Sequence, residues 1–356
     1  MKLKDIGKII TGNTPSKKND EYYSSKDILF IKPGDIEENY ITSLKNSEEY
    51  ISEKARGKAK ILPEGAVLVT CIGTIGKVGI LEKEATCNQQ INAIIPNDKV
   101  ISKYLAYLIQ SKQKILKLKA NAPVVPIINK KDFSEIEINI CNKDNQIKIV
   151  KQLDLLKKII DRRKKQIEEL DNIIKSQFVE MFGNPISNNK NWEMYKWDNV
   201  LTIKNGKNQK KVEKPDGEYP IYGSGGIMSY ARDYICSEDS VIIGRKGNIN
   251  NPILVRTKFW NVDTAFGLEP NKDKINVEYL YYFCHFYNFE KHNKAVTIPS
   301  LTKSDLLNID IPVPNIELQN KFADFIKVID KQKFEIEKSL KEMENLYNSL
   351  MDEYFG

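Results

Sequence analysis

Few residues of this chain have the types and spacing that enzyme chemistry requires. His285 and His292 lie seven positions apart, but two imidazoles without further ligands do not complete a metal site. The segment 222–226 (Tyr-Gly-Ser-Gly-Gly) has a tyrosine where a nucleophile elbow has its first glycine. No lysine has Asp or Glu two positions before it, and neither His-Glu-x-x-His nor a P-loop occurs. The sequence therefore predicts that the chain is not itself an enzyme and holds no metal.

The composition is that of a folded, mildly basic protein. The 356 residues carry 55 Lys and Arg against 48 Asp and Glu, a net charge of +7, which leaves nucleic-acid binding open without proving it. Five cysteines are scattered without a Cys-x-x-Cys pair, which predicts free thiols. No apolar stretch is long enough to span a membrane, and the first residues lack the pattern of a secretory signal. We therefore expect a cytoplasmic protein with no membrane partner.

An internal repeat at a spacing of about 173 residues organises the chain. Residues 125–133 resemble 298–306, and we pair residues 72–76 (Ile-Gly-Thr-Ile-Gly) with 243–247 (Ile-Gly-Arg-Lys-Gly). Each half ends in Phe-Gly, at 182–183 and at 355–356. The chain is thus predicted to contain two copies of one fold.

Each half ends in a predicted long helix, at 146–183 and at 319–356. Apolar residues recur there at alternating steps of four and three, the pattern of a coiled-coil seam, interrupted by Arg163 and Lys333. Each helix would be about 37 residues, or ~55 Å, long. The second helix must run antiparallel to the first to bury its seam. The predicted seam residues are Leu153, Leu156, Ile160, Ile167, Leu170, Ile174, Ile326, Ile329, Ile336, Leu340, Met343 and Tyr347.

Residues 1–145 and 184–318 are predicted to form two globular domains of mixed structure. Short β-branched runs at 28–31, 66–70 and 240–243 predict strands. Helical patterns occur at about 101–118 and 276–290, and Asp132 and Asp305 are candidate helix caps. The predicted fold class is α+β, with two domains related by an internal pseudo-twofold repeat and separated by a long antiparallel two-helix coiled coil.

This pattern resembles the specificity (S) subunit of type I restriction–modification systems. The resemblance covers the whole chain and rests on the order of domains, the duplication and several short segments. These segments are 3–16 (LKDIGKIITGNTPS), 31–36 (IKPGDI), 72–79 (IGTIGKVG), 217–227 (GEYPIYGSGGI) and 241–247 (VIIGRKG).

The resemblance implies a function. Each globule would be a target-recognition domain that reads one half of a bipartite, asymmetric sequence in double-stranded DNA, and the helices would set the spacing. Each half would recruit one of two methyltransferase (M) subunits, and motor-nuclease (R) subunits would join the complex. S-adenosylmethionine, ATP and magnesium would belong to these partners, so no cofactor is expected in this chain.

Base reading requires side chains with paired donors and acceptors, and phosphate contact requires cations, hydroxyls or backbone amides. The candidates in the first globule are Thr11, Asn13, Thr14, Lys17, Lys18, Lys32, Lys77, Asn88, Gln89 and Gln90. Those in the second are Lys204, Asn205, Lys207, Asn208, Gln209, Lys210, Lys211, Tyr222, Ser224, Arg232, Arg245 and Lys246.

Two other functions stay open at this point. The chain could be a stand-alone restriction or modification enzyme with a divergent active site, although every expected motif is missing. It could also be a coiled-coil scaffold whose globules bind proteins. Strongly salt-dependent retention of duplex DNA would separate DNA binding from the scaffold.

Overall fold

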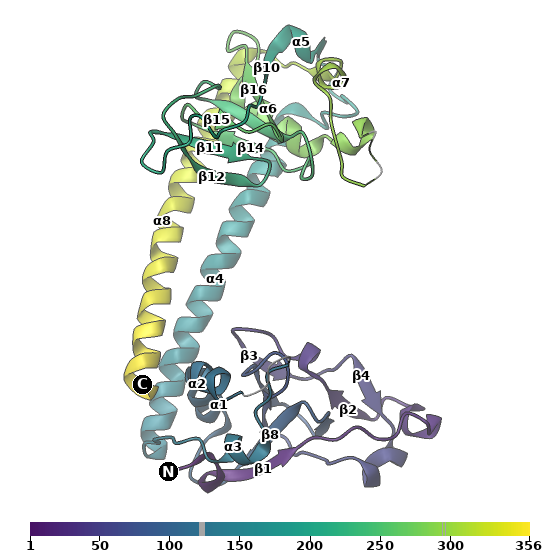
Figure 1. Cartoon of the computed structure of the whole chain (residues 1–356), viewed down its shortest axis with the longest axis vertical. Coiled ribbons are helices and arrows are strands. Elements are labelled where there is room, and N and C mark those ends of the chain that lie inside the picture. Colours follow the sequence, from purple (N-terminus) through teal and green to yellow (C-terminus); the bar gives the residue numbers. More distant parts are fainter. Residues whose placement is uncertain (121–124, 294, 296) are drawn as a thin grey trace. The chain divides into compact units, whose positions relative to one another are not determined.

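The computed structural model describes residues 1–120, 125–293, 295 and 297–356. The chain divides into two compact units (Figure 1). The first unit comprises Met1–Arg162 and Ser339–Gly356, and the second comprises Arg163–Lys338. Each unit therefore contains one globule and a part of each long helix.

The first globule is built on two sheets. The order of the larger sheet is β1-β8-β5-β6-β3, and that of the smaller sheet is β4-β2-β7. The strands are β1 (Gly7–Thr11), β2 (Ile28–Ile31), β3 (Ile41–Leu44), β4 (Glu49–Ile51), β5 (Val67–Thr70), β6 (Val78–Leu81), β7 (Ala85–Cys87) and β8 (Ile91–Pro96). The helices are α1 (Ser102–Ser111), α2 (Gln113–Lys119) and α3 (Lys130–Ser134), with 3-10 turns η1 (Leu3–Asp5), η2 (Asp20–Tyr23), η3 (Pro33–Asp35) and η4 (Glu53–Lys58).

The second globule repeats this plan with nine strands in three sheets. Its sheets are ordered β10-β16-β13-β14, β12-β11-β15 and β17-β9. The strands are β9 (Met194–Lys196), β10 (Leu201–Asn205), β11 (Tyr219–Gly223), β12 (Gly226–Ala231), β13 (Ser240–Gly244), β14 (Ile253–Val255), β15 (Trp260–Asn261), β16 (Ala265–Pro270) and β17 (Asp310–Pro312). The helices are α5 (Trp197–Val200), α6 (Val277–Phe286) and α7 (Lys303–Leu307), with a 3-10 turn η5 (Phe289–His292).

The α+β class with two repeated domains is confirmed. The apolar runs at 28–31, 66–70 and 240–243 form β2, β5 and β13, which are buried along their whole length. Continuous burial explains why these runs read as uninterrupted apolar stretches and not as an alternating pattern. The helical patterns at 101–118 and 276–290 become α1 with α2, and α6.

The repeat is visible in the hydrogen bonds as well as in the strand order. The amide of Gly73 donates to the carbonyl of Pro126 at 3.0 Å, and the amide of Gly247 donates to that of Pro299 at 2.9 Å. Both glycines have a positive φ, 76° and 78°. Gly73 therefore corresponds to Gly247, and the predicted pairing of 72–76 with 243–247, which set Gly73 against Gly244, was wrong by three residues. Two Gly-rich segments can be aligned in more than one register when only sequence is used.

The long helices are α4 (Lys143–Phe182) and α8 (Ile316–Phe355), each of 40 residues. Both begin three residues before the predicted starts, 146 and 319. Asn142 and Asn315 cap them, because their side-chain oxygens accept from the amides of Asn145 at 3.0 Å and Leu318 at 2.8 Å. The two capping asparagines are related by the repeat.

The two helices are antiparallel within each unit (Figure 1). In the second unit Lys333 pairs with Asp171 at 2.7 Å, and the rings of Phe178 and Phe322 lie 5.5 Å apart. The residue number rises along α4 as it falls along α8, which confirms the predicted direction.

The short helices α3 and α7 correct another prediction. The caps are Asn129 and Thr302, whose side-chain oxygens accept from the amides of Asp132 and Asp305 at 2.8 and 3.2 Å. The two aspartates lie in the first turn and not at the cap position. An acidic side chain in the first turn is favourable beside the helix N-terminus. Because Asp is also a common cap residue, the two positions are easily confused when only the sequence is known.

One buried polar side chain ties each long helix to its globule. Gln146 and Gln319 are both 0% exposed. The Gln146 side chain accepts from the amide of Ile101 at 3.0 Å and donates to the carbonyls of Lys99 and Cys141 at 2.9 and 2.8 Å. Gln319 repeats all three bonds, accepting from Asn276 and donating to Lys274 and Pro314.

Candidate nucleic-acid interface

The predicted basic segment 204–211 begins in the last two residues of β10 and continues as a loop with a fixed backbone. It leaves β10 at Gly206, where an added Cβ would meet the carbonyl oxygen of Val262 at 1.8 Å. The amide of Lys207 then donates to the carbonyl of Asn261 at 3.0 Å, and the indole of Trp260 donates to the carbonyl of Lys207 at 2.9 Å. Only glycine allows this approach, and the bonds that follow hold the loop in one path.

The cations of this loop divide into paired and unpaired side chains. Lys207, Lys210 and Lys211 are exposed, and no ion pair involves them within the described part of the chain. Arg232 is exposed and donates to the carbonyl of Lys211 at 3.2 Å. Lys204 instead pairs with Glu269 at 3.4 Å. Three unpaired cations on a fixed loop suit phosphate contact. The amide-bearing candidates Asn205, Asn208 and Gln209 lie on the same segment.

The polar segment 11–18, at and after the end of β1, is held in place by hydrogen bonds from its own side chains. Thr11 donates to Asn92 at 2.6 Å, and Thr14 donates to Gln89 at 2.8 Å. Asn13 donates to the carbonyl of Lys58 at 2.7 Å and accepts from the amide of Lys60 at 2.9 Å. These residues shape the loop. Lys17 and Lys18 are exposed on it, and Lys17 lies 3.9 Å from the carboxylate of Glu49.

Four other candidates of the first unit are engaged inside it. Lys32 forms an ion pair with Glu49, and this contact holds the pKa of the Glu49 carboxyl below its ordinary value. Lys77 donates to the carbonyl of Pro33 at 3.3 Å. Asn88 is only 6% exposed and donates to Gln90 at 2.8 Å, which gives both a structural role. We therefore do not propose Asn88 as a base contact.

The two loops occupy equivalent positions in the two units. The amides of Gly12 and Gly206 donate to the carbonyls of Ile91 and Ala265, at 3.0 and 3.3 Å. The next amides donate in the same way, Asn13 to Cys87 at 2.9 Å and Lys207 to Asn261 at 3.0 Å. One framework therefore presents Asn-Thr-Pro-Ser-Lys-Lys in the first unit and Lys-Asn-Gln-Lys-Lys in the second.

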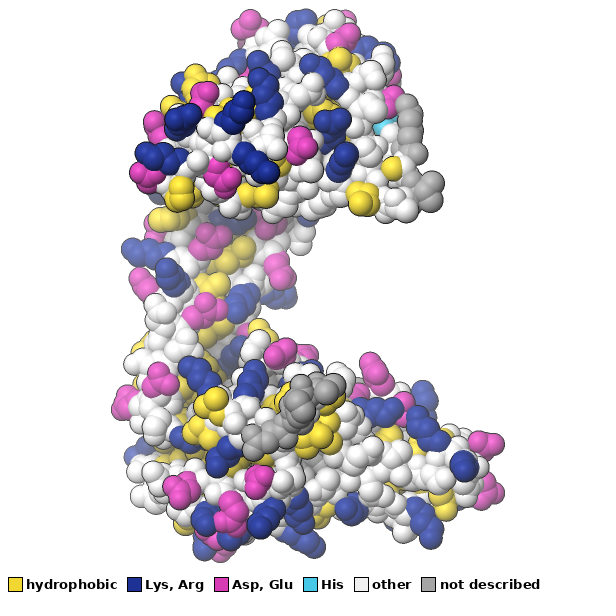
Figure 2. All heavy atoms as spheres, viewed as in Figure 1, with side chains coloured by type: hydrophobic (Ala, Val, Ile, Leu, Met, Phe, Trp, Pro, Cys, Tyr) yellow, Lys and Arg dark blue, Asp and Glu magenta, His cyan; other side chains and the backbone are white. Residues whose placement is uncertain are grey.

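The remaining candidates of the second unit lie on β11, in the turn that follows it and directly after β13. Tyr222 is half-buried with its ring 5.6 Å from that of Phe259, and Ser224 lies in the turn. Arg245 donates to the carbonyl of Asp263 at 3.4 Å, and Lys246 is exposed. Figure 2 shows lysine and arginine side chains gathered over the face of the second unit that carries β11, β12 and β15.

The predicted helical seam lies on the inner side of both helices. Leu153, Leu156, Ile160, Ile174, Ile326 and Ile329 are buried, and Ile167, Leu170, Ile336, Leu340, Met343 and Tyr347 are half-buried.

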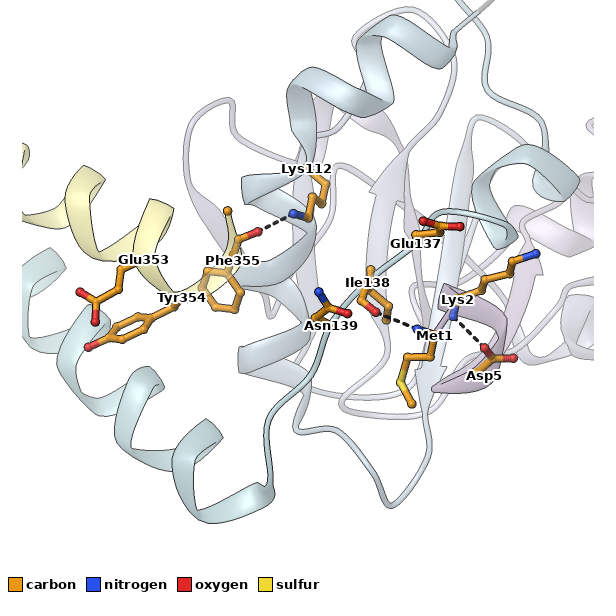
Figure 3. Close-up of a pocket in the computed structure, with 11 residues that line it drawn as sticks. Met1, Lys2, Asp5, Lys112, Glu137, Ile138, Asn139, Glu353, Tyr354 and Phe355 are labelled. Carbon is orange, nitrogen blue, oxygen red and sulfur yellow. Dashed lines mark hydrogen bonds between the residues drawn. The ribbon is translucent and has the colours of Figure 1, made fainter.

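A cavity of about 550 Å³ lies in the first unit beside both ends of the chain (Figure 3). Met1 donates from its amino group to the carbonyl of Ile138 at 3.1 Å, and Lys112 donates to the carbonyl of Phe355. In the second unit the corresponding carbonyl, of Phe182, accepts from the indole of Trp192 at 2.9 Å. The segment after α4 therefore supplies, in the second unit, the donor that Lys112 supplies in the first.

The described residues show little that suits metal or thiol chemistry. No group of three or more His, Cys, Asp or Glu side chains in this part of the chain is arranged to hold a metal ion. All five cysteines are free, and burial raises the pKa of Cys71, Cys87 and Cys236 to about 12. No helix in the described ranges is long and apolar enough to cross a membrane.

Sequence reasoning missed several of the residues that position these loops. Gly12 and Gly206, Gln146 and Gln319, and Asn142 and Asn315 recur at matching places in the two halves. Only the repeat could have singled them out, because each has an ordinary residue type when it is read alone.

Comparison with known proteins agrees with this geometry. Residues 1–172 and 189–344 match the family model for the type I restriction modification DNA specificity domain. The MjaIX specificity subunit of a type I restriction enzyme from Methanocaldococcus jannaschii is 28% identical, over 93% of this chain and 88% of its own. The HindI specificity subunit from Haemophilus influenzae is 36% identical, over 40% of this chain and 31% of its own.

The fold agrees with that of a solved structure. The S subunit of a type I restriction-modification system from M. genitalium gives a TM-score of 0.63 at 16% identity, covering 100% of this chain and 95% of that chain. The two matches to the family's domain, each of which extends into a long helix, account for nearly the whole sequence. The chain therefore belongs to the family of type I restriction–modification DNA specificity subunits.

Proposed function

We propose that this chain is the non-catalytic subunit that recognises DNA sequence in a type I restriction–modification complex. Each unit reads one half of a bipartite, asymmetric site in double-stranded DNA. The observation that carries this proposal is the equivalence of the loops that follow Gly12 and Gly206. Each loop follows the edge strand of the larger sheet in its own unit, β1 in the first and β10 in the second. Both loops carry cations and amides, but in different sequences.

This combination is what two readers of different sequences require. A shared framework places each loop at the same position relative to the duplex, while different amides and cations meet different base edges. The unpaired cations Lys207, Lys210 and Lys211 supply phosphate contact in the second unit. Lys17 and Lys18 are the corresponding cations of the first unit.

The repeat also supports two copies of one partner. On the exposed sides of α4 and α8, Leu155 and Val328 are 59% and 58% exposed, and Ile173 and Leu346 are 47% and 44% exposed. Each pair is separated by the repeat distance, so each unit presents one residue from each pair. Recurrent exposed apolar side chains suit a repeated protein contact. We assign these positions to two methyltransferase subunits.

The other components of the proposed complex are separate proteins. Motor-nuclease subunits complete it, and S-adenosylmethionine, ATP and magnesium belong to the methyltransferase and motor-nuclease subunits. This chain would contribute the choice of sequence and no catalytic group.

The test is methylome sequencing of a host that expresses this chain with its genomic neighbours. We expect a bipartite, asymmetric methyladenine motif that disappears when this chain is deleted and returns when it is restored. The neighbouring methyltransferase with an empty vector is the control. The proposal fails if the complex is assembled and methylates DNA, but its motif is unchanged by deletion of this chain.

A further inference from the structure

A hollow of about 590 Å³ in the second unit lies outside the loops discussed above. It covers one face of the β11–β12 hairpin, and Tyr222, Ile227 and Tyr230 line it together with Arg256 and Lys258. Ile227 and Tyr230 are 54% and 42% exposed. The hollow is large enough to receive a small ring-shaped ligand.

A β-bulge aims these side chains into the hollow. Ile221 pairs with Ser229 and Tyr222 pairs with Ile227, so Met228 is an extra residue in β12. The extra residue changes the alternation of the strand, and Ile227 and Tyr230 therefore lie on the face that carries Tyr222. A regular strand would place residues 227 and 230 on opposite faces.

The corresponding face of the first unit is closed by the chain itself. Leu29 and Ile31 of β2 are 1% and 0% exposed, and Ile36 and Leu44 pack with them in one cluster. Ile36 and Leu44 belong to the segment that separates β2 from β4. In the second unit β11 passes into β12 through a short turn at 223–226, and no such segment exists. The second unit therefore leaves open part of a face that the first unit uses as core, while Tyr222 on this face packs at its inner side against Phe259.

The chemistry of the hollow suits a neutral planar ring with polar edges. Tyrosine rings offer stacking surfaces, and no hydrogen bond from the hydroxyls of Tyr219, Tyr222 or Tyr230 is found among the described residues. Arg256 at the rim is already paired with Asp239 and Glu278, and Lys258 lies over the ring of Tyr234 at 4.8 Å. Glu218 and Glu238, which also line the hollow, can therefore accept from the amino group of a base. A site for a simple anion would lack these two carboxylates.

We propose that this hollow is a nucleobase-binding site, in which the base stacks on Tyr230 and Tyr222. The amide of Lys214 donates to the carbonyl of Tyr230 at 2.8 Å, and the amide of Arg232 donates to that of Val212 at 3.1 Å. The basic loop and its continuation therefore run along the strand that carries Tyr230. A DNA strand held by this loop would have its bases within reach of the hollow.

The inference deepens the proposed function. The case in which the base comes from bound DNA rests on that proposed function. A base everted from bound DNA and the base of a free nucleotide offer the same chemistry. The experiment therefore has one arm for each source.

The first arm titrates the full chain with adenosine, guanosine, cytidine and thymidine 5′-monophosphates, followed by saturation-transfer NMR. We expect binding that Tyr230→Leu weakens about tenfold, because loss of one aromatic stacking partner typically costs that much. Tyr230→Phe keeps the ring and should bind as the unaltered chain does. Tyr230 is 42% exposed and belongs to no buried cluster among the described residues, so neither change should disturb folding. Equal binding by the Leu and Phe variants would overturn the site.

The second arm uses the chain assembled with its methyltransferase and a duplex that carries 2-aminopurine at successive positions of the half-site read by the second unit. Fluorescence should rise severalfold at one position other than the methylated adenine. The rise should persist in Tyr230→Phe and disappear in Tyr230→Leu. Nucleotide binding without any such Tyr230-dependent signal would assign the hollow to free nucleotides and overturn DNA as the source.

The two hypotheses fail in different ways. If the methylated motif depends on this chain but neither arm depends on the Tyr230 ring, the proposed function stands and the nucleobase site is wrong. If nucleotides bind through Tyr230 but deletion of the chain leaves methylation unchanged, the site stands and the proposed function is wrong.

Discussion

At the scale of single residues, polar side chains in this chain have two roles: some satisfy backbone groups inside a unit, and others present free charge to solvent. Gln146 and Gln319 are fully buried and satisfy backbone groups of the globule. Lys207, Lys210 and Lys211 are exposed and bind no carboxylate within the described residues. The first kind determines whether a unit folds, and the second determines what it can attract.

We expect Gln146→Leu to destabilise the first unit by about 2–4 kcal/mol, because it leaves one amide and two carbonyls, all partly buried, without the partner that Gln146 provides. Urea unfolding of the full chain, followed by proteolysis of the first globule, measures this loss. Gln152→Leu is the matched control, since Gln152 lies exposed on the same helix and accepts only from the hydroxyl of Tyr354. Equal effects of the two changes would show that the buried bonds contribute nothing.

Replacing Lys207, Lys210 and Lys211 by Ala should weaken DNA binding at specific and unrelated sequences alike. Phosphate contacts carry no sequence information, and each lost contact reduces the slope of log affinity against log salt by about 0.9. We therefore expect the slope to fall by up to about 3. Fluorescence anisotropy of the assembled complex at several salt concentrations measures it.

The control for this triple change is Lys196, Lys272 and Lys274 together replaced by Ala. Their side chains already contact Asp310 at 2.8 Å, Asp239 at 3.5 Å and the carbonyl of Asn199 at 3.0 Å. Both triple variants lose three positive charges. If they flatten the salt dependence equally, net charge and not the basic loop governs binding.

At the scale of elements, the two leucines Leu170 and Leu155 separate the roles of α4. Leu170 packs against the core of the second unit, whereas Leu155 is exposed. We expect Leu170→Asp to destabilise the second unit by about 2–4 kcal/mol, because a carboxylate would replace a partly buried apolar side chain. Leu155→Asp should leave thermal unfolding of the free chain unchanged.

Leu155→Asp should impair assembly with the methyltransferase although it leaves the stability of the free chain unchanged. Leu155→Asp places a charge where we assign the methyltransferase contact, so it should lower retention of the methyltransferase in size-exclusion chromatography. Val328→Asp is the repeat-related test and should lower it to a similar degree. Retention of both methyltransferase copies by Leu155→Asp would refute this assignment.

Much of this element structure could be predicted from sequence. The steps of four and three along 146–183 and 319–356 identified the inner faces of α4 and α8, because burial along one stripe demands that spacing. The caps could not be predicted in the same way. Asn129, Thr302, Asn142 and Asn315 act through single side-chain bonds, which leave no periodic signal.

The candidate interface was predictable only in part. The cations of 204–211 stood out by their density, and their exposure follows from the loop that carries them. The engagement of Asn88 with Gln90 and of Lys32 with Glu49 depends on residues that fold next to them, and residue type alone does not reveal it. The hollow over β12 depends on a bulge and on an absent segment, neither of which has a sequence motif.

At the scale of the whole molecule, each unit has its own core and its own presenting loop. The chain passes from α4 into the second globule through Gly183, whose φ of 78° favours glycine, and enters α8 at the cap Asn315. Aromatic side chains join the globule to both helices. Phe178 of α4 stacks on Tyr279 and Phe286, and the ring of Phe322 in α8 lies 5.5 Å from that of Tyr282, so a replacement globule must carry rings at these places. Gln319, the main polar link, contacts only backbone groups of the globule, and these exist in any sequence of the same fold.

We therefore expect that residues 184–314 can be replaced by the corresponding globule of another family member. The exchanged complex should methylate a hybrid motif in which one half-site is new and the other is unchanged, because 1–145 keeps its own loop. Methylome sequencing of the host reads both half-sites at once. An exchange of 184–318, which would also replace the cap Asn315 and the first residues of α8, is the comparison and should assemble less well. A change in both half-sites after the shorter exchange would mean that the units do not read DNA independently.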